Sequence, residues 1–167
     1  MRGRTYLGLG VWRYLSTNKF HPRFLFMCKK ITKYGLSILL LSLGGLIYII
    51  YRPTELIMFD WFREIGIENI IKYLRLNYND INIYEWIKYN LPAGLWLFSY
   101  MFLIDAIWDK DNKSKSYFLF LSIIPIASIL SEISQFLGLL NGTFDIKDIL
   151  AYIGAITLFL IIKIFKL

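Results

Sequence analysis

Four long apolar runs alternate with polar segments along this chain of 167 residues. The runs cover residues 34–51, 91–108, 117–140 and 149–165, and charged residues gather mainly between them. Each run approaches the roughly 20 residues that an α-helix needs to cross the hydrocarbon core of a bilayer. The pattern therefore predicts an all-α, polytopic integral membrane bundle of about four transmembrane helices, because a helix satisfies its own backbone hydrogen bonds in lipid.

Residues 52–90 follow a different pattern, in which acidic and basic residues are mixed with apolar ones. The apolar positions recur every three or four residues, as at Phe59, Phe62 and Ile65. This spacing predicts one or two amphipathic helices, with a break near residues 77–80. The helices could lie on the membrane surface, pack on the bundle as a lid, or do both.

The first 33 residues form a basic N-terminal tail without acids, which we expect to be irregular and cytoplasmic. Two interpretations of residues 1–26 stay open: Met27 is the true start, or the tail is a genuine extension. No small-residue cleavage site follows the first apolar run, which favours an uncleaved membrane helix over a signal peptide.

Basic residues also indicate the orientation of the chain in the membrane. They gather before the first run, in the loop between the second and third runs, and at the end of the fourth, as at Lys33, Lys113 and Lys163. The positive-inside rule therefore predicts a multi-pass protein of the bacterial cytoplasmic (inner) membrane with both termini in the cytoplasm. Residues 52–90 and the turn at 141–148 then face outward.

Composition supports lipid as the solvent of the protein. Hydrophobic residues make up 57% of the chain and aromatic residues 18%, which is more apolar surface than a soluble domain of this length can hide. The net charge of +7 sits at the ends of the apolar runs, so we expect no nucleic-acid partner. A single cysteine, Cys28, and a single histidine, His21, cannot build a zinc site, although carboxylates alone could still hold Mg²⁺ or Ca²⁺. We predict no metal and no cofactor.

Candidate chemistry begins with Glu132, an ionisable residue inside the third run. Such a residue is costly in lipid and normally faces the interior of a bundle. Ser128 and Gln135 share its helical face, and Glu132 lies roughly 22 Å along its helix from the inner end. The following turn carries Thr143, Asp145 and Asp148. We expect a polar pocket at the outward end of the helical hairpin, formed by Glu132, Gln135, Asp145, Asp148, Ser128 and Thr143.

Plainer structural roles for these residues stay open. Asp145 and Asp148 have the spacing of an N-cap and a first-turn acid, and Glu132 could be a buried hydrogen-bonding residue. Asn90, which precedes Leu91-Pro92, is predicted to cap the second membrane helix. Asp105 is expected only to reach the membrane interface.

Residues 90–165 resemble the VanZ-like family of small polytopic bacterial membrane proteins. The resemblance rests on Glu132-Ile-Ser-Gln135, on Gly142-Thr-Phe-Asp145-Ile-Lys-Asp148-Ile-Leu and on Gly154, preceded by Leu91-Pro-Ala-Gly-Leu-Trp96. It implies a three-helix core over residues 91–165, with helices at 91–108, 117–140 and 149–165. The founding member of the family is associated with low-level teicoplanin resistance, and the resemblance implies no catalytic residue.

The chain departs from the family pattern at three places. Thr143 stands about where an arginine is common, Tyr152 near the place of an asparagine, and Ala93 at the place of an acid. Loss of this cationic partner would leave Asp145 and Asp148 less neutralised.

Several functions fit these features. The favoured one is non-enzymatic: an outward polar pocket that recognises a lipid-linked or other cell-envelope component, or influences glycopeptide susceptibility. A membrane-embedded enzyme acting on a lipid-linked substrate is the first alternative, with Glu132 or Asp148 as general base. An accessory subunit of a larger membrane complex is another, and a small transporter is disfavoured because no internal repeat is visible.

Overall fold

The computed structural model describes residues 20–78, 81, 83–108 and 114–165. These residues form seven helices and no strand, as the all-α prediction requires. The helices are α2 (Phe20–Tyr51), α3 (Ile57–Glu64), α4 (Glu68–Tyr78), α5 (Glu85–Tyr89), α6 (Leu91–Ile107), α7 (Lys115–Phe136) and α8 (Ile146–Ile164).

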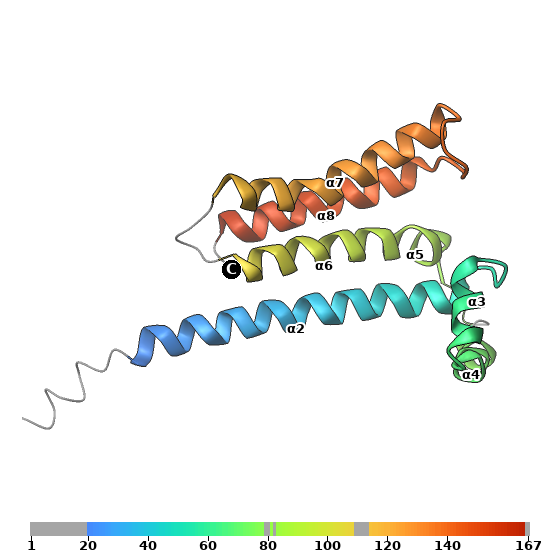
Figure 1. Cartoon of the computed structure of the whole chain (residues 1–167), viewed down its shortest axis with the longest axis horizontal. Helices are drawn as coiled ribbons and strands as arrows, with labels where there is room; N and C mark the ends of the chain where they lie inside the picture. The colour runs from blue at the N-terminus through green and yellow to red at the C-terminus, as the bar shows by residue number, and fades with distance from the viewer. Residues whose placement is uncertain (1–19, 79–80, 82, 109–113, 166–167) are drawn as a thin grey trace, which may run out of the picture.

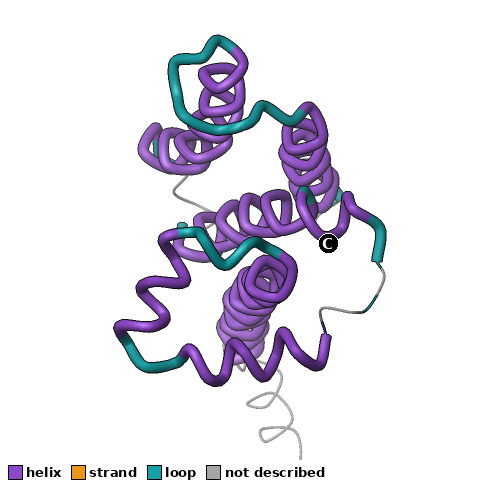
Figure 2. Tube along the Cα trace, turned by 90° about the vertical axis from the view of Figure 1, so that its right-hand side faces the viewer, coloured by secondary structure: helices purple, strands orange, loops and turns teal. Residues whose placement is uncertain are grey.

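Four long helices, α2, α6, α7 and α8, run side by side (Figure 1). The central helix is α6, which contacts the other three. We call one end of this bundle the lysine end, where Lys33, Asp105 and Lys163 lie, and the other the carboxylate end, where Asn90 and Asp145 lie. The short helices α3 and α4, here called the crossing pair, lie across the carboxylate end of α2 (Figures 1 and 2).

The core forms around α6 because this helix is apolar on almost every side, which is typical of a helix surrounded by others. Its buried residues pack against Ala155 and Phe159 of α8. Phe102 meets Phe98 and Phe159 edge to face, with ring centroids 4.8 and 5.6 Å apart. Leu40 of α2 and Leu121 of α7 close the core from the outer helices.

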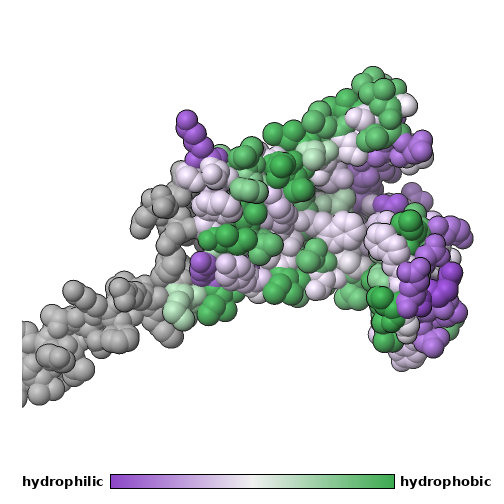
Figure 3. Space-filling model, in the orientation of Figure 1, coloured by the Kyte–Doolittle hydropathy of each residue, from purple (hydrophilic) through white to green (hydrophobic). Residues whose placement is uncertain are grey.

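Two helices are long and apolar enough to cross a membrane, α7 over its whole length and α2 over Lys30–Tyr51. Only 11% of the residues in the apolar stretch of α2 and 17% of those in α7 are buried inside the protein. The core helix of a soluble protein would be mostly buried. Large apolar side chains cover the outer faces of both helices (Figure 3). The apolar helix α6 is shorter than these two, and α8 carries charged residues near both ends.

The basic tail differs from its prediction, because α2 begins at Phe20 rather than after residue 33. Pro22 falls in the first turn of the helix, where a missing N–H costs nothing. Residues 1–19 lie outside the described part of the chain, so the predicted tail is seen only from Phe20 onward. The amphipathic segment also differs in detail: it forms three short helices, and α4 ends at Tyr78, near the predicted break.

Two glycines let helices approach closely. A Cβ on Gly44 would lie 2.7 Å from Nε1 of Trp96, so the bare backbone of α2 accommodates the indole of α6. A Cβ on Gly94 would lie 3.1 Å from the backbone oxygen of Ala151, where α6 meets α8. Gly45 and Gly154 have no such neighbour within 4 Å.

Replacing Gly94 by leucine is expected to push α6 and α8 apart and to lower the free energy of unfolding by about 1–3 kcal/mol, the usual cost of overpacking. Thermal unfolding of the purified protein in detergent measures this effect. Gly154→Leu on α8 is the matched control, because its side chain enters open space. Equal melting temperatures for the two variants would contradict the close contact of α6 and α8.

Candidate functional site

Asp145 and Asp148 begin α8 in the way that their spacing predicts. Asp145 is the N-cap residue, and its Oδ1 accepts a hydrogen bond of 2.9 Å from the backbone N–H of Lys147. Asp148 follows in the first turn of the helix, where the helix dipole favours a negative charge. The predicted capping role is confirmed, and it leaves further carboxylate oxygens of both residues for other contacts.

Asn90 supplies the contact that joins these two aspartates to α6. Its side-chain nitrogen donates to Oδ2 of Asp145 at 2.9 Å and to Oδ1 of Asp148 at 2.8 Å. The residue is only 2% exposed, so the two bonds replace water that it cannot reach. The prediction for Asn90 is half right: it occupies the N-cap position of α6, but its side chain caps nothing there and holds the start of α8 instead.

Glu132 brings α7 into the same cluster. The residue is 6% exposed, and its Oε2 accepts a hydrogen bond of 3.3 Å from the backbone N–H of Asp145. Its charge also acts on that of Asp148. Three carboxylates from α7 and the start of α8 therefore meet around one buried carboxamide. We call Glu132, Asn90, Asp145 and Asp148 the carboxylate cluster.

The other predicted pocket residues lie beside this cluster. Gln135 packs against Gly142, whose φ of +150° suits glycine, and its Nε2 lies 3.5 Å from Oγ of Ser131. Ser128 is half-buried one turn before Glu132, and Thr143 is exposed in the turn. Among the contacts of the described residues, none joins Ser128 or Thr143 to the carboxylates.

Arg52, at the end of α2, faces the carboxylate cluster from the opposite side. Its positive charge acts on both Asp145 and Asp148. Its guanidinium donates to the backbone oxygen of Tyr89 at 2.9 Å and lies over the rings of Tyr48 and Tyr89. The loss of an arginine near Thr143 is therefore offset in part, because the end of α2 brings Arg52 from a distant part of the chain.

The charges do not cancel. With all groups ionised, the three carboxylates carry −3 and the two cations that act on Asp145, Lys147 and Arg52, carry +2, which leaves a net charge of −1 around Asn90. A small cavity of about 60 Å³ lies elsewhere, between α3 and α4, where Arg63 and Lys72 pair with Glu68. Within the carboxylate cluster, Asn90 and Glu132 are buried, while Asp145 and Asp148 are half-buried. Figure 3 shows an indentation between the crossing pair and the α7–α8 turn.

The environment of Asp145 favours its charged form. The hydrogen bonds from Asn90 and from the N–H of Lys147 hold the pKa of its carboxyl below the ordinary value of 3.8. The charges of Lys147 and Arg52 act in the same direction, while partial burial opposes them. Ionised Asp145 therefore stabilises the folded protein.

This stabilisation is complete above pH 3.8 and is lost as the pH falls through the lower pKa of the folded state. The melting temperature in detergent should therefore fall less steeply below pH 3.8 in Asp145→Asn than in the wild type. Asparagine can keep the helix cap through its oxygen, but its NH2 cannot accept from Asn90, so the slope of the pH profile is compared rather than the absolute melting temperature. Glu55→Gln, which removes an exposed acid outside the cluster, is the control. Parallel pH profiles for the wild type and Asp145→Asn would contradict the prediction.

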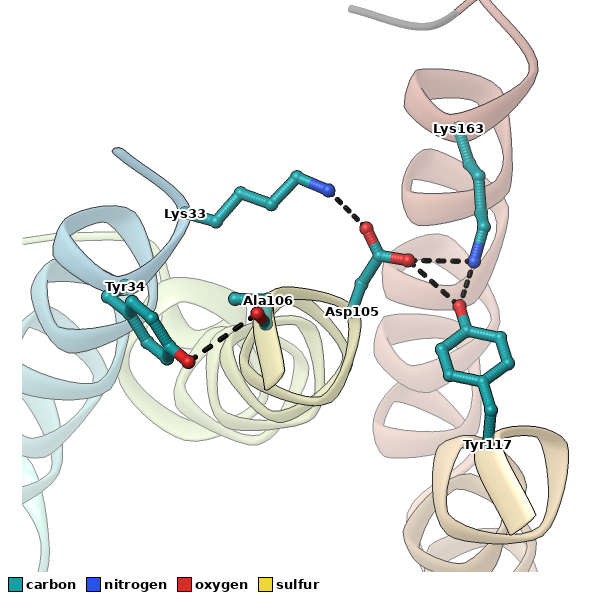
Figure 4. A network of polar contacts seen from close by, with 6 residues as sticks. All are labelled: Lys33, Tyr34, Asp105, Ala106, Tyr117 and Lys163. Carbon is teal, nitrogen blue, oxygen red and sulfur yellow. Dashed lines mark hydrogen bonds and ion pairs between the residues drawn. The ribbon is translucent and has the colours of Figure 1, made fainter. Parts of the chain in front are cut away.

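A second polar network at the lysine end joins all four long helices (Figure 4). Asp105 of α6 accepts hydrogen bonds from Lys33 of α2, from Lys163 of α8 at 2.9 Å and from the hydroxyl of Tyr117 of α7 at 2.9 Å. Lys163 also donates to the Tyr117 hydroxyl, and Tyr117 is fully buried. We call these four residues the Asp105 clasp.

The expectation that Asp105 only reaches the membrane interface is wrong. Its side chain is 14% exposed and pairs with Lys33 and Lys163, whose side chains are 27% and 25% exposed. The sequence contained a signal for this network. Asp105 lies near the cytoplasmic end predicted for its apolar run, and Lys33 and Lys163 lie at the same predicted end of two other runs, so the three can pair if the helices pack together. The pairing itself depends on which helices are neighbours.

Metal binding is not indicated by the described residues, among which no group of three or more His, Cys, Asp or Glu side chains has the arrangement to hold an ion. Cys28 is exposed near the start of α2. The arrangement suits hydrogen bonding and charge recognition, through two polar networks at opposite ends of an apolar bundle. No family model, no curated protein and no solved structure matches the chain.

Proposed function

We propose that the protein is a VanZ-like integral membrane protein of about four spans, in the bacterial cytoplasmic membrane, whose carboxylate cluster recognises a cell-envelope component. The observation that carries the proposal is a cluster at one end of an otherwise apolar bundle, in which Asn90 bonds Asp145 and Asp148 while Glu132 bonds the backbone N–H of Asp145. Buried ionisable groups are costly in such a setting and are normally kept for a function.

The apolar surface supports the membrane placement. A helix of 22 residues, as α7 is, reaches roughly 33 Å at 1.5 Å per residue, against a hydrocarbon core of about 30 Å. The shorter α6 packs against α2, and α8 packs against α6 and α7. A bilayer that covers α2 and α7 would therefore also contain α6 and α8.

The lysines support the orientation. Lys30 and Lys33 near the start of the apolar stretch of α2, Lys115 at the start of α7 and Lys163 at the end of α8 share one end of the bundle. Basic residues favour the cytoplasmic side. The carboxylate cluster then faces outward, where envelope precursors and glycopeptides are found.

Topology is tested with single cysteines in a Cys28→Ser background, at Thr143 and Ser116, which are exposed at opposite ends of the bundle. A membrane-impermeant maleimide applied to whole cells should label Thr143→Cys at once and Ser116→Cys only after permeabilisation. The reverse pattern would place the carboxylate cluster in the cytoplasm and would overturn an envelope-facing role.

Function is tested by expressing the protein in a glycopeptide-sensitive bacterial host and measuring susceptibility to teicoplanin. The wild type should lower susceptibility, and Glu132→Gln should lose the effect at equal membrane abundance, because glutamine keeps the hydrogen bond from Asp145 but removes the charge. Glu55→Gln is the matched control. Full activity of Glu132→Gln would contradict recognition by the cluster, and no effect of the wild type would contradict the link to glycopeptides.

A further inference from the structure

The crossing pair has an apolar surface that the bundle does not cover. Ile57, Trp61 and Ile65 follow one another at intervals of four residues along and just beyond α3, and all three are exposed. On α4, Ile70, Tyr73 and Leu76 recur at intervals of three and are also exposed. Residues at these spacings lie along one face of a helix. Each helix therefore presents an exposed apolar stripe.

Each helix of the crossing pair also buries one large apolar residue on another face. Phe59 of α3 and Ile71 of α4 are buried, while charged residues such as Asp60, Glu64 and Lys72 occupy the remaining faces. Figure 3 shows apolar surface on the side of the crossing pair nearer the bundle and hydrophilic surface on the side away from it. Such a distribution is typical of helices that lie in a membrane interface.

A second exposed apolar surface lies at the same end of the molecule. The turn from α7 to α8, here called the apolar turn, carries large exposed side chains despite its position at a helix connection: Phe136, Leu137, Leu139, Leu140, Phe144 and Ile146. A turn in water is normally polar. Phe136 and Phe144 pack edge to face, with ring centroids 5.1 Å apart, and brace the turn.

The carboxylate cluster lies between these two surfaces. The apolar turn contains Asp145 between Phe144 and Ile146, and Asn90 joins that residue to the start of α6. The crossing pair lies on the other side of α6 from the turn (Figures 1 and 2). Arg75 of α4 donates to the backbone oxygens of Ile49 and Arg52, which ties the crossing pair to the helix end that faces the cluster.

We propose that the crossing pair and the apolar turn both insert into the outer leaflet, so that the carboxylate cluster sits at the level of the lipid headgroups. The inference rests on the proposed function, because it assumes that the bundle spans the membrane with this end outward. Bilayer lipid covers both apolar surfaces, and the indentation between them gives a lipid headgroup access from the side. A water-soluble ligand would not need either surface.

The test measures how three relaxing agents act on nitroxide labels in nanodiscs of phosphatidylethanolamine and phosphatidylglycerol. Single cysteines in a Cys28→Ser background carry the labels. Oxygen reports the hydrocarbon, a nickel-chelating lipid reports the headgroups, and a soluble nickel chelate reports water. Labels at Ile65 and Leu139 should be relaxed several-fold more by oxygen than by the soluble chelate. A label at Thr143 should respond most to the nickel-chelating lipid.

Glu64 and Lys72 are the matched controls on the crossing pair, and their labels should respond to the soluble chelate. Stronger relaxation of Ile65 and Leu139 by the soluble chelate would overturn the proposal and leave the cluster open to soluble ligands. Protection of both labels from all agents would also overturn it, since another protein or a second copy would then cover them. A label at Ile126 on α7 distinguishes failure of the proposed function from failure of this inference. If only this label is relaxed by oxygen, the bundle spans the membrane but the crossing pair and the apolar turn do not insert.

Discussion

Replacing Asn90 by leucine is expected to lower the free energy of unfolding by about 3 kcal/mol and to abolish function. Hydrogen bonds to charged groups contribute about 1.5–3 kcal/mol each, and Asn90 makes two, to Asp145 and Asp148. Leucine has a similar volume, so the change removes the donors without leaving a cavity. The two carboxylates would then face each other and Glu132 without a shared donor, and their repulsion would loosen the start of α8.

Thermal and denaturant unfolding in detergent measure this loss, with Asn69→Leu, at an exposed position on α4, as the control. A double-mutant cycle makes the origin specific. Adding Asp148→Asn to Asn90→Leu removes one of the stranded charges and should recover part of the lost stability. A change of less than about 0.5 kcal/mol in Asn90→Leu would show that the carboxylate cluster does not hold α6 to α8.

Replacing Asp105 by asparagine is expected to be the most disruptive change at the lysine end, lowering the free energy of unfolding by about 3 kcal/mol. Removing one partner of a largely buried ion pair typically costs about 3–5 kcal/mol, because the other charge keeps its desolvation penalty. The lower figure applies here since Lys33 and Lys163 are about one quarter exposed and can turn toward the interface. Both lysines lose their shared carboxylate at once.

The size of this effect depends on burial, and a second aspartate in the chain provides the comparison. Asp60 pairs with Arg63 at 3.2 Å, but both side chains are more than half exposed. Asp60→Asn should therefore change stability by less than about 1 kcal/mol, as surface ion pairs do. Lys33→Gln should fall between the two, because Asp105 keeps Lys163. Equal losses in Asp105→Asn and Asp60→Asn would mean that the Asp105 clasp does not join the helices.

The two polar networks each fix the arrangement of the helices at one end of the bundle. Apolar packing in lipid holds helices together without selecting one arrangement strongly, because lipid tails are as apolar as the side chains. Contacts of the Asp105 clasp come from all four long helices, and those of the carboxylate cluster come from α6, α7 and α8.

The helices themselves follow from local sequence. The apolar run at 91–108 corresponds closely to α6, the run at 117–140 contains most of α7, which ends four residues earlier at Phe136, and Asp145 caps α8 as its spacing from Asp148 predicts. These features depend on neighbours within about one helical turn, so the order of residues contains all the information. Glu132 also stood out from sequence alone, because an acid inside an apolar run is rare.

Contacts between helices were decided only by the tertiary structure. Asn90 lies 55 residues from Asp145, Lys33 lies 72 from Asp105, and Lys163 lies 58 from Asp105. The role of Arg52 depends in the same way on where α2 ends relative to α8. Whether such residues meet depends on which helices are neighbours and how each is rotated about its axis. The choice of neighbouring helices and the rotation of each helix are set by many side chains together, so no local sequence pattern predicts them.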